Sequence, residues 1–261
     1  MIPKISEILG YAPIDIHAHI DHGVLGDRTD YIEEWEENVH FCTREFVLTE
    51  YDNVGIEFGA MSTYSSVARS DTMTVENVWL NELLNEEPRF RQWVVIHPDC
   101  EESFAQAEKY LKDDRVLGIK IHPSSHEYDI LEKGDKIFSF ANDLGATVLM
   151  HPMAEREMPV FANRYPNMRL IIAHLADEKF VDAMRGAKYG NIYADTSGGA
   201  SSKNNVVEYA VSKVGAEKIL FGTDTYSTAF QTGRIAWARI SDEDKYKILR
   251  GNALKMFPGA F

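Results

Sequence analysis

Five short apolar segments of this sequence each end in a residue that can bind a metal ion, and no other feature constrains the fold as strongly. The segments cover residues 14–19, 117–122, 147–151, 170–174 and 218–224, and each ends in histidine or aspartate. Aliphatic and β-branched runs of this length are typical of buried parallel strands. Because parallel strands end at the same edge of their sheet, we expect these terminal side chains to converge on one site.

Strand-like and helix-like segments alternate along the chain. We predict strands at residues 14–19, 54–60, 93–96, 116–121, 147–151, 170–174, 191–196 and 219–224. We predict helices at residues 30–50, 75–84, 103–111, 137–144, 160–165, 179–187, 206–214 and 242–257. Eight strands that are each followed by a helix predict an α/β fold, a single (β/α)8 TIM barrel. An open doubly wound sheet is the alternative, but it gives no reason for ligands at the ends of the first, fifth, sixth and eighth strands.

The second predicted strand has the least regular pattern, because Gly55, Glu57 and Gly59 interrupt it. Glu57 is either a buried residue that faces the interior of the barrel or a sign that the strand is misplaced. The position of this strand therefore depends on which way Glu57 faces.

The length of the chain agrees with one barrel domain. At 261 residues it is close to the roughly 250 residues of a typical TIM barrel. No Gly/Ser-rich or Pro-rich stretch is long enough to act as a linker. We therefore expect a single domain over residues 1–261.

The charge and the apolar pattern limit the partners of the protein. The sequence carries 41 acidic and 27 basic residues, whereas nucleic acids and anionic membranes bind clustered lysine and arginine. It lacks a signal-peptide pattern and an apolar run near the roughly 20 residues that span a bilayer, and Cys42 lies far from Cys100. We expect a cytoplasmic protein that acts on a small molecule, with no nucleic acid or membrane partner. The apolar helices would permit a homodimer.

The paired histidines at the first strand end predict a metal site. His17 and His19 are two residues apart, so on a strand both imidazoles point to the same face. Two imidazoles on one buried face without a cation would be costly to desolvate. Together with His151, His174 and Asp224 they supply the nitrogen and carboxylate ligands that suit Zn²⁺, and also Mn²⁺, Fe²⁺ or Co²⁺. A water on such an ion becomes hydroxide near neutral pH, so the pattern indicates a metal-dependent hydrolase.

Several motifs resemble one family of such enzymes, in the same order along the chain. The chain is similar to the amidohydrolase superfamily, in the amidohydrolase-related branch that includes the aminocarboxymuconate semialdehyde decarboxylase group. The matching motifs are IHAH at residues 16–19, GIKIHP at 118–123, LMH at 149–151, IAH at 172–174, ADTSG at 194–198, LFGTD at 220–224 and RGNALKMF at 250–257. They cover nearly the whole chain, and the resemblance implies a TIM barrel and a metal-dependent activity.

The resemblance also implies roles for individual residues. His17, His19, His151 and Asp224 would bind the metal ion. Asp224 would in addition take a proton from the metal-bound water and return it to the leaving group, a role open to a carboxylate that stays ionised beside a dication. His174 would polarise the substrate carbonyl, act as a base on water, or join the metal ligands.

Three further residues are expected to contact the substrate. Lys120 and His122 share one face of their strand by spacing, and Asp195 ends the seventh predicted strand. In some superfamily members a lysine on the fourth strand is carbamylated and bridges two metal ions; otherwise Lys120 remains an ammonium that pairs with a substrate carboxylate or with Asp224. We favour one ion, with two expected if Lys120 is carbamylated. The alternative for Asp195 is that it caps the following segment or accepts backbone hydrogen bonds.

The resemblance leaves two reactions open, and hydrolysis is the main prediction. A metal-activated water would attack an amide, lactone or ester-like carbon at the C-terminal face of the barrel. The alternative is a non-oxidative decarboxylase of the same branch; those relatives tend to be longer, and the short connection at residues 152–167 favours hydrolysis. A barrel that binds a metal ion without turnover is a third hypothesis, which the complete set of ligand positions opposes.

Other candidate residues are assigned to structural roles or left as alternatives. Decarboxylases of this group borrow an active-site arginine from a partner subunit, and the candidates here are Arg28, Arg156 and Arg164. Residues 175–177 (Leu-Ala-Asp) stand where relatives commonly carry small glycines. Residues expected to have structural roles are His22, His40, His97, His126, Tyr64, Trp79 and Trp93; for His22, which follows the first strand, the alternative is that it lines the mouth of the site.

Overall fold

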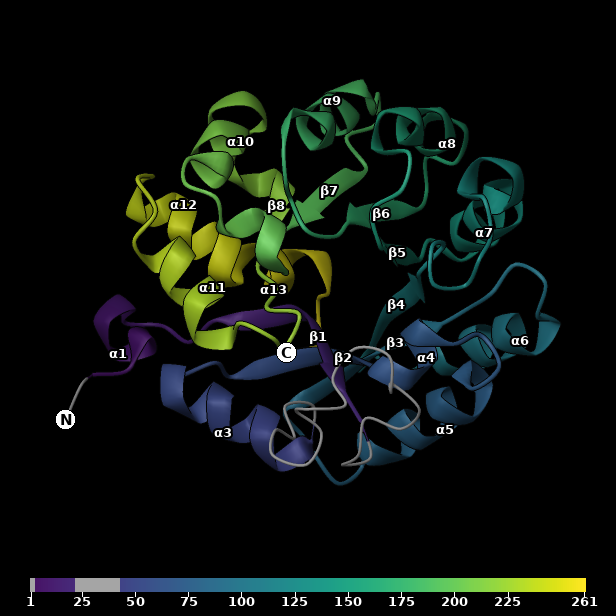
Figure 1. Cartoon of the computed structure of the whole chain (residues 1–261), viewed down its shortest axis with the longest axis horizontal. Helices are drawn as coiled ribbons and strands as arrows, with labels where there is room; N and C mark the ends of the chain where they lie inside the picture. The colour runs from purple at the N-terminus through teal and green to yellow at the C-terminus, as the bar shows by residue number, and fades with distance from the viewer. Residues whose placement is uncertain (1–2, 22–42) are drawn as a thin grey trace.

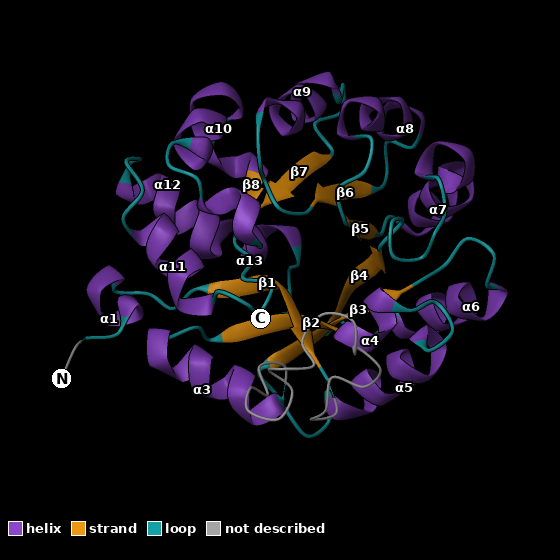
Figure 2. Cartoon of the chain, in the orientation of Figure 1, coloured by secondary structure: helices purple, strands orange, loops and turns teal. Residues whose placement is uncertain are grey.

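The strands of the protein form one parallel sheet whose order in space follows the chain. The computed structural model describes residues 3–21 and 43–261. Its strands are β1 (Ile14–Ile20), β2 (Phe58–Thr63), β3 (Phe90–Val95), β4 (Val116–Ile121), β5 (Thr147–Met150), β6 (Arg169–Ile172), β7 (Ile192–Asp195) and β8 (Ile219–Leu220), each paired in parallel with the next. They form an inner ring with the helices outside (Figures 1 and 2).

Backbone hydrogen bonds between the first strand and the segment after the last close this ring. The amide of Ile16 donates to the carbonyl of Phe221 at 2.9 Å, and the amide of Asp224 donates to the carbonyl of His17 at 2.8 Å. The predicted (β/α)8 barrel is therefore confirmed, and the open sheet is excluded.

Most strands are followed by a helix that covers the outside of the sheet. The longer helices are α3 (Arg44–Val54), α5 (Met73–Leu83), α6 (Glu101–Tyr110), α7 (Ile130–Leu144), α8 (Met158–Arg164), α9 (Glu178–Gly186), α10 (Val206–Val214) and α11 (Thr228–Ala236). The shorter ones are α1 (Ile5–Leu9), α4 (Tyr64–Ala68), α12 (Asp242–Tyr246), the π-helical η4 (Lys247–Gly251), α13 (Asn252–Met256) and the 3₁₀ turns η1 (Glu155–Glu157), η2 (Gly199–Ser202) and η3 (Ala216–Lys218). Side chains such as that of Asp129 cap the helix starts, and Gly145 ends α7 in the left-handed conformation.

The interior of the barrel has an apolar floor at the N-terminal ends of the strands. Trp93 is fully buried there, its Nε1–H donates to the carbonyl of Ile16 at 2.7 Å, and its ring meets Phe257 edge to face. A Cβ on Gly118 would collide with this indole and with a neighbouring carbonyl, so the glycine makes room for Trp93. Met256, Phe257 and other residues at the C-terminus complete this cluster, and the C-terminus lies near the centre of the ring in Figure 1.

Several predicted elements differ from the structure; for example, α7 begins at Ile130 rather than at residue 137, and β8 ends at Leu220 rather than at residue 224. Strand β2 begins at Phe58, four residues later than predicted, because α3 continues to Val54 and ends on Gly55 with a positive φ of 89°. Glu57 precedes the strand, is exposed and pairs with Arg250 at 2.6 Å, so the alternative of a misplaced strand is confirmed. Helix α11 was not predicted, and the predicted helix at residues 242–257 contains a π-helical turn.

Some predictions fall on chain segments without a description. The first part of the predicted helix at residues 30–50, together with His22, Arg28, His40 and Cys42, lies outside the described residues. Within the described ranges, no helix is both long enough and apolar enough to cross a membrane.

Candidate metal centre

The predicted ligands converge at the C-terminal end of the barrel, opposite the apolar floor. A cavity of about 90 Å³ lies there. Its lining residues are His17, His19, Tyr64, Val67, Lys120, His122, His151, His174, Asp224 and Tyr226. Every predicted site residue except Asp195 contributes to this wall, so the structure brings together side chains from β1, β4 and the segments after β4, β5, β6 and β8.

A break in the pairing of β1 allows one strand to serve both the floor and the cavity. Ile14 and Ile16 belong to the apolar cluster inside the barrel, whereas simple alternation would send His17 outward. The register between β1 and β2 shifts between Asp15 and Ala18, which marks a β-bulge. His17 and His19 therefore also face the interior, one layer above the isoleucines.

His17, His19 and Asp224 have the arrangement of a metal-binding group. One potential ligand atom from each of the three lies within 4.8 Å of the other two. Asp224 Oδ1 is 3.0 Å from His19 Nε2 and 3.6 Å from His17 Nε2. Two imidazole nitrogens and a carboxylate oxygen suit a divalent transition-metal ion, so these residues fit the cation that the sequence predicts.

Asp195 orients His17 from behind the cavity. His17 Nδ1 lies 2.8 Å from Asp195 Oδ2, so the ring donates its proton there and turns the lone pair of Nε2 toward the cavity. Asp195 also accepts the amides of His174 at 3.0 Å and Ser197 at 2.9 Å. Burial opposes its charge, but the charge and hydrogen bond of His17, followed by the charge of His174 and the hydroxyl of Ser197, hold the pKa of Asp195 well below its usual range. These are the contacts of an orienting residue, because the carboxylate is fully buried rather than exposed to the cavity.

Ser62 and Thr225 fix the second histidine. Ser62 Oγ lies 3.1 Å from His19 Nδ1, on the side of the ring away from Asp224. Thr225 Oγ1 accepts the amide of His19 at 2.7 Å and donates to its carbonyl at 2.8 Å. The end of β1 is thereby tied to the segment that carries Asp224.

Of the other three histidines, His122 and His151 are stacked, and His174 meets the ring of His151 edge to face. The rings of His122 and His151 are parallel, with centroids 3.8 Å apart, and His174 lies 5.0 Å from His151. His174 Nδ1 is 2.9 Å from Ser197 Oγ. Burial, followed by the charges of His174 and Lys120, lowers the pKa of His151 to about 3, which favours the neutral form that binds metals. The role of His151 as a ligand stays a prediction, because neither of the two compact groups of ligand atoms among the described residues contains it: one is His17, His19 and Asp224, and the other is His17, His174 and Asp195.

Lys120 places a positive charge beside the candidate ligands. Its side chain is almost completely buried, and Nζ lies 2.7 Å from His17 Nε2. Burial lowers the pKa of Lys120 to about 8, while Asp224 and Asp195 oppose this shift. Nε2 of His17 therefore faces the side-chain nitrogen of Lys120. Whether Lys120 is carbamylated, and whether one or two ions bind, stay predictions.

Asp15 is a buried carboxylate that sequence analysis missed. It accepts hydrogen bonds from the amide of His17 at 3.0 Å, the hydroxyl of Tyr51 at 2.8 Å and both the amide and the hydroxyl of Thr223. Burial raises its pKa to about 7 despite these donors. The sequence did carry a signal for Asp15, because a carboxylate within the apolar segment at residues 14–19 is unusual.

The backbone around the site is locally strained. His174, Asp224 and Thr225 have φ values of 65°, 59° and 62°, in a region that residues other than glycine rarely adopt. Such conformations concentrate at functional sites, where surrounding contacts maintain them.

Sequence analysis also missed the aromatic residues that line the cavity. Tyr64 was expected to be structural, but it lines the cavity together with Tyr226, and the two rings meet edge to face with centroids 5.8 Å apart.

The remaining candidates lie away from the cavity. His126 is buried, and its Nε2 lies 2.9 Å from the carbonyl of Ser66, while His97 Nε2 lies 3.3 Å from the carbonyl of His126, so both have the contacts expected of structural residues. Arg156 pairs with Glu178 and Asp182 on the outer surface, and Arg164 pairs with Asp135.

A closed parallel barrel with clustered histidines and an aspartate at its C-terminal end defines the class of metal-dependent barrel enzymes. The family model described as amidohydrolase matches residues 14–259. The chain therefore belongs to the amidohydrolase family, as its motifs predicted. A search of curated proteins finds no significant match.

Several solved structures share this fold over nearly their whole length. One is a 2,6-dihydroxybenzoate decarboxylase complexed with 2,6-dihydroxybenzoate (TM-score 0.74, 16% identity, covering 94% of this chain and 98% of that chain). Another is a dihydroxybenzoic acid decarboxylase from Polaromonas sp. JS666 with bound manganese and the inhibitor 2-nitroresorcinol (0.75, 18%, 94% and 96%). A third is a 5-carboxyvanillate decarboxylase from Novosphingobium aromaticivorans DSM 12444 complexed with manganese (0.74, 15%, 98% and 99%). At these identities the likeness shows the fold alone.

Proposed function

We propose that this protein is a metal-dependent, non-oxidative decarboxylase of a small hydroxylated aromatic carboxylic acid. The observation that carries the choice of reaction is the match to three decarboxylases over 96% to 99% of their chains. With this coverage, the length of the chain no longer favours hydrolysis. The predicted hydrolysis of an amide, lactone or ester stays an untested alternative.

The substrate would lie between the metal ligands and an adjoining groove. His17, His19 and Asp224 would hold a divalent cation, with His151 as a further ligand, and the cation would bind and polarise the acidic oxygens of the substrate. Manganese is the first ion to test because two of the decarboxylases contain it, and zinc remains the prediction from the ligand types. The groove, about 400 Å³, shares His151, His174 and Asp224 with the cavity and includes Pro152 and Phe180.

In this reaction, Asp224 would transfer the proton and Lys120 would balance the negative charge of the substrate. The hydrogen bond from His19 and the nearby histidines hold the pKa of Asp224 well below its usual range despite burial, so the free enzyme carries a carboxylate there. Asp224 would accept the proton of the substrate hydroxyl and deliver it to the ring carbon that bears the carboxylate. The bond from that carbon to the carboxylate then breaks and CO₂ leaves, with one solvent proton consumed overall. The cation on Lys120 would offset the negative charge of the substrate.

The test compares the two reactions on one protein preparation. Protein loaded with Mn²⁺ or Zn²⁺ is incubated with a panel of ortho-hydroxybenzoates and, separately, with esters and lactones. We expect CO₂ release from at least one acid, and in D₂O one deuterium at the vacated ring position. Asp224→Asn should abolish the reaction, whereas Asp99→Asn, which changes an exposed carboxylate paired with Lys133, should not. Hydrolysis of an ester or lactone with no CO₂ from any acid would overturn the proposal.

A further inference from the structure

A second cavity lies at the opposite end of the barrel from the metal centre. It has a volume of about 320 Å³ and lies between the starts of β6, β7 and β8 and the helix α13. We call it the basal cavity, and its lining residues are Arg169, Tyr193, Glu217, Lys218, Asn252, Lys255 and Met256. This volume is within the range of pockets that hold small molecules.

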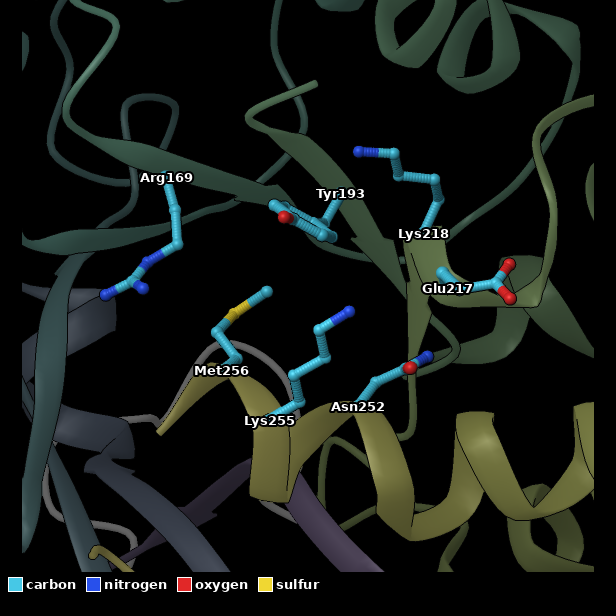
Figure 3. Close-up of a pocket in the computed structure, with 7 residues that line it drawn as sticks. All are labelled: Arg169, Tyr193, Glu217, Lys218, Asn252, Lys255 and Met256. Atoms are coloured by element: carbon cyan, nitrogen blue, oxygen red, sulfur yellow. The ribbon is translucent and has the colours of Figure 1, made fainter. Parts of the chain in front are cut away.

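Three cationic side chains surround the basal cavity. Figure 3 shows Lys218 extending across one side of the Tyr193 ring while Lys255 rises from α13 toward the other side, with Arg169 at the left of the view. The ammonium of Lys218 lies 4.5 Å from the centroid of the Tyr193 ring. The protein as a whole has a formal net charge of -14, so this concentration of positive charge runs against its average.

Glu217 lines the same cavity, and its charge acts on both Lys218 and Lys255 without forming an ion pair with either. Among residues 3–21 and 43–261, no ion pair joins Arg169, Lys218 or Lys255 to a carboxylate. The one acid in the lining, Glu217, is held by Lys247 at 2.8 Å. Arg169 donates through Nε to Thr147 Oγ1 at 3.0 Å, which leaves the two terminal nitrogens of its guanidinium for other acceptors.

Repulsion from Lys255 adds to the cost of burying the charge of Lys218. Lys218 is partly buried and donates to the carbonyl of Gly190. Burial lowers the pKa of Lys218; Glu217 opposes this shift, and the charge of Lys255 adds to it. Like charges that are partly removed from water repel one another, and an anion between them would remove that cost.

We propose that the basal cavity binds a small phosphorylated anion. A guanidinium and two ammonium groups around one space are the groups that proteins use for phosphate oxygens, and the guanidinium favours planar, bidentate contacts. Asn252 does not contribute donors, because its amide already bonds to the carbonyls of Ala216 and Ile219. The site is independent of the metal centre and of the reaction proposed for it.

Calorimetric titration of the full-length protein with inorganic pyrophosphate tests this site. We expect binding of one pyrophosphate per chain and a higher melting temperature in its presence, since a ligand of the native state stabilises it. Lys218→Gln/Lys255→Gln should weaken binding at least about tenfold, and Arg169→Gln should act in the same direction. The single variant Lys255→Gln should fold normally because Lys255 is exposed, so weaker pyrophosphate binding by this variant would not be due to misfolding.

Two control variants distinguish binding in the basal cavity from binding elsewhere on the protein. Lys213→Gln removes an exposed lysine whose ammonium also lies near a tyrosine ring, at 5.7 Å from Tyr209, and should leave binding unchanged. His17→Ala/His19→Ala removes two metal ligands and should also leave binding unchanged. The proposal would be overturned by no binding, by binding that is lost in the histidine variant, or by equal affinity in the lysine variants. Binding of citrate without binding of pyrophosphate would overturn phosphate as the ligand class.

Discussion

The two ends of the barrel are formed by the same strands, yet their interiors have opposite chemistry. At the N-terminal end, Trp93 and Phe257 pack in an apolar floor with Ile14 and Ile16. At the C-terminal end, one layer higher on β1, His17 faces a cavity with imidazoles, a carboxylate and an ammonium. Inside the barrel, the apolar floor and the metal centre thus lie at opposite ends of one axis.

The two ends of the barrel also differ in backbone strain and in buried charge. At the C-terminal end, His174, Asp224 and Thr225 hold positive φ angles, and Asp195 is a completely buried carboxylate. Strain and buried charge both oppose folding. The apolar floor contributes the burial that offsets these costs. Changes at the two ends should therefore separate loss of activity from loss of stability.

The largest effect is expected from Asp224→Asn. The amide preserves the shape of the side chain but neither carries a proton nor supplies a charged ligand, so turnover should fall by about 10³-fold or more. Unfolding by urea should be little changed. Rates on a confirmed substrate and metal content measure the effect, and wild-type activity in the variant would show that Asp224 is not the proton carrier.

The matching change in the floor is Phe257→Ala. Phe257 is 7% exposed and meets Trp93 edge to face, so its truncation should lower the free energy of unfolding by about 3–5 kcal/mol. Metal stoichiometry of the folded protein should stay the same. Phe230→Ala is the control, because that ring is 57% exposed and should change stability by only about 0.5 kcal/mol. Loss of the metal without loss of stability would contradict the division between the two ends.

A smaller effect is expected from changing Asp195, which lies behind the candidate metal ligands. In Asp195→Asn the acceptor that orients His17 becomes an amide, so the affinity for the metal should fall by about 10-fold to 100-fold. Competition with a chelator of known affinity measures this loss. Ser197→Ala removes a hydroxyl that lies 2.8 Å from His17 Nδ1 and should cost less. Equal metal affinity in Asp195→Asn and the wild type would mean that the carboxylate has no orienting role.

The contrast between the two ends was only partly visible in the sequence. Apolar runs with a terminal ligand leave a local pattern, so most of the strands were predictable. The same pattern marked the candidate residues His17, His19, His151, His174 and Asp224. The bulge in β1 was not, since it depends on pairing with β2, which carries no signal within the strand itself.

Long-range contacts limited the rest of the prediction. The orienting role of Asp195 depends on His17, which is 178 positions away in sequence. The strand β2 was misplaced because local propensity could not show that α3 runs on to Gly55. The basal cavity was missed for a similar reason: Arg169, Lys218 and Lys255 come from separate elements, and only the closed barrel brings them together.

The smallest effects come from two glycines that differ in their distance from the site. Gly198 has φ 70° and ψ 168°, a conformation almost restricted to glycine, and a Cβ there would lie 2.6 Å from His174 Nδ1. Gly198→Ala should cost about 1–3 kcal/mol of stability and lower kcat by displacing His174. Gly145 has φ 63° at the end of α7, and a Cβ there meets nothing within 4 Å.

Gly145→Ala should therefore cost about 1 kcal/mol through the backbone alone and leave kcat unchanged. The pair isolates the position of His174 from the general cost of a positive φ, because both variants carry the backbone strain and only one meets the imidazole. Steady-state kinetics and urea unfolding of both variants measure the difference. If both variants lost stability but kept wild-type kcat, the placement of His174 would not matter for turnover, and the strain at this end would need a different reason.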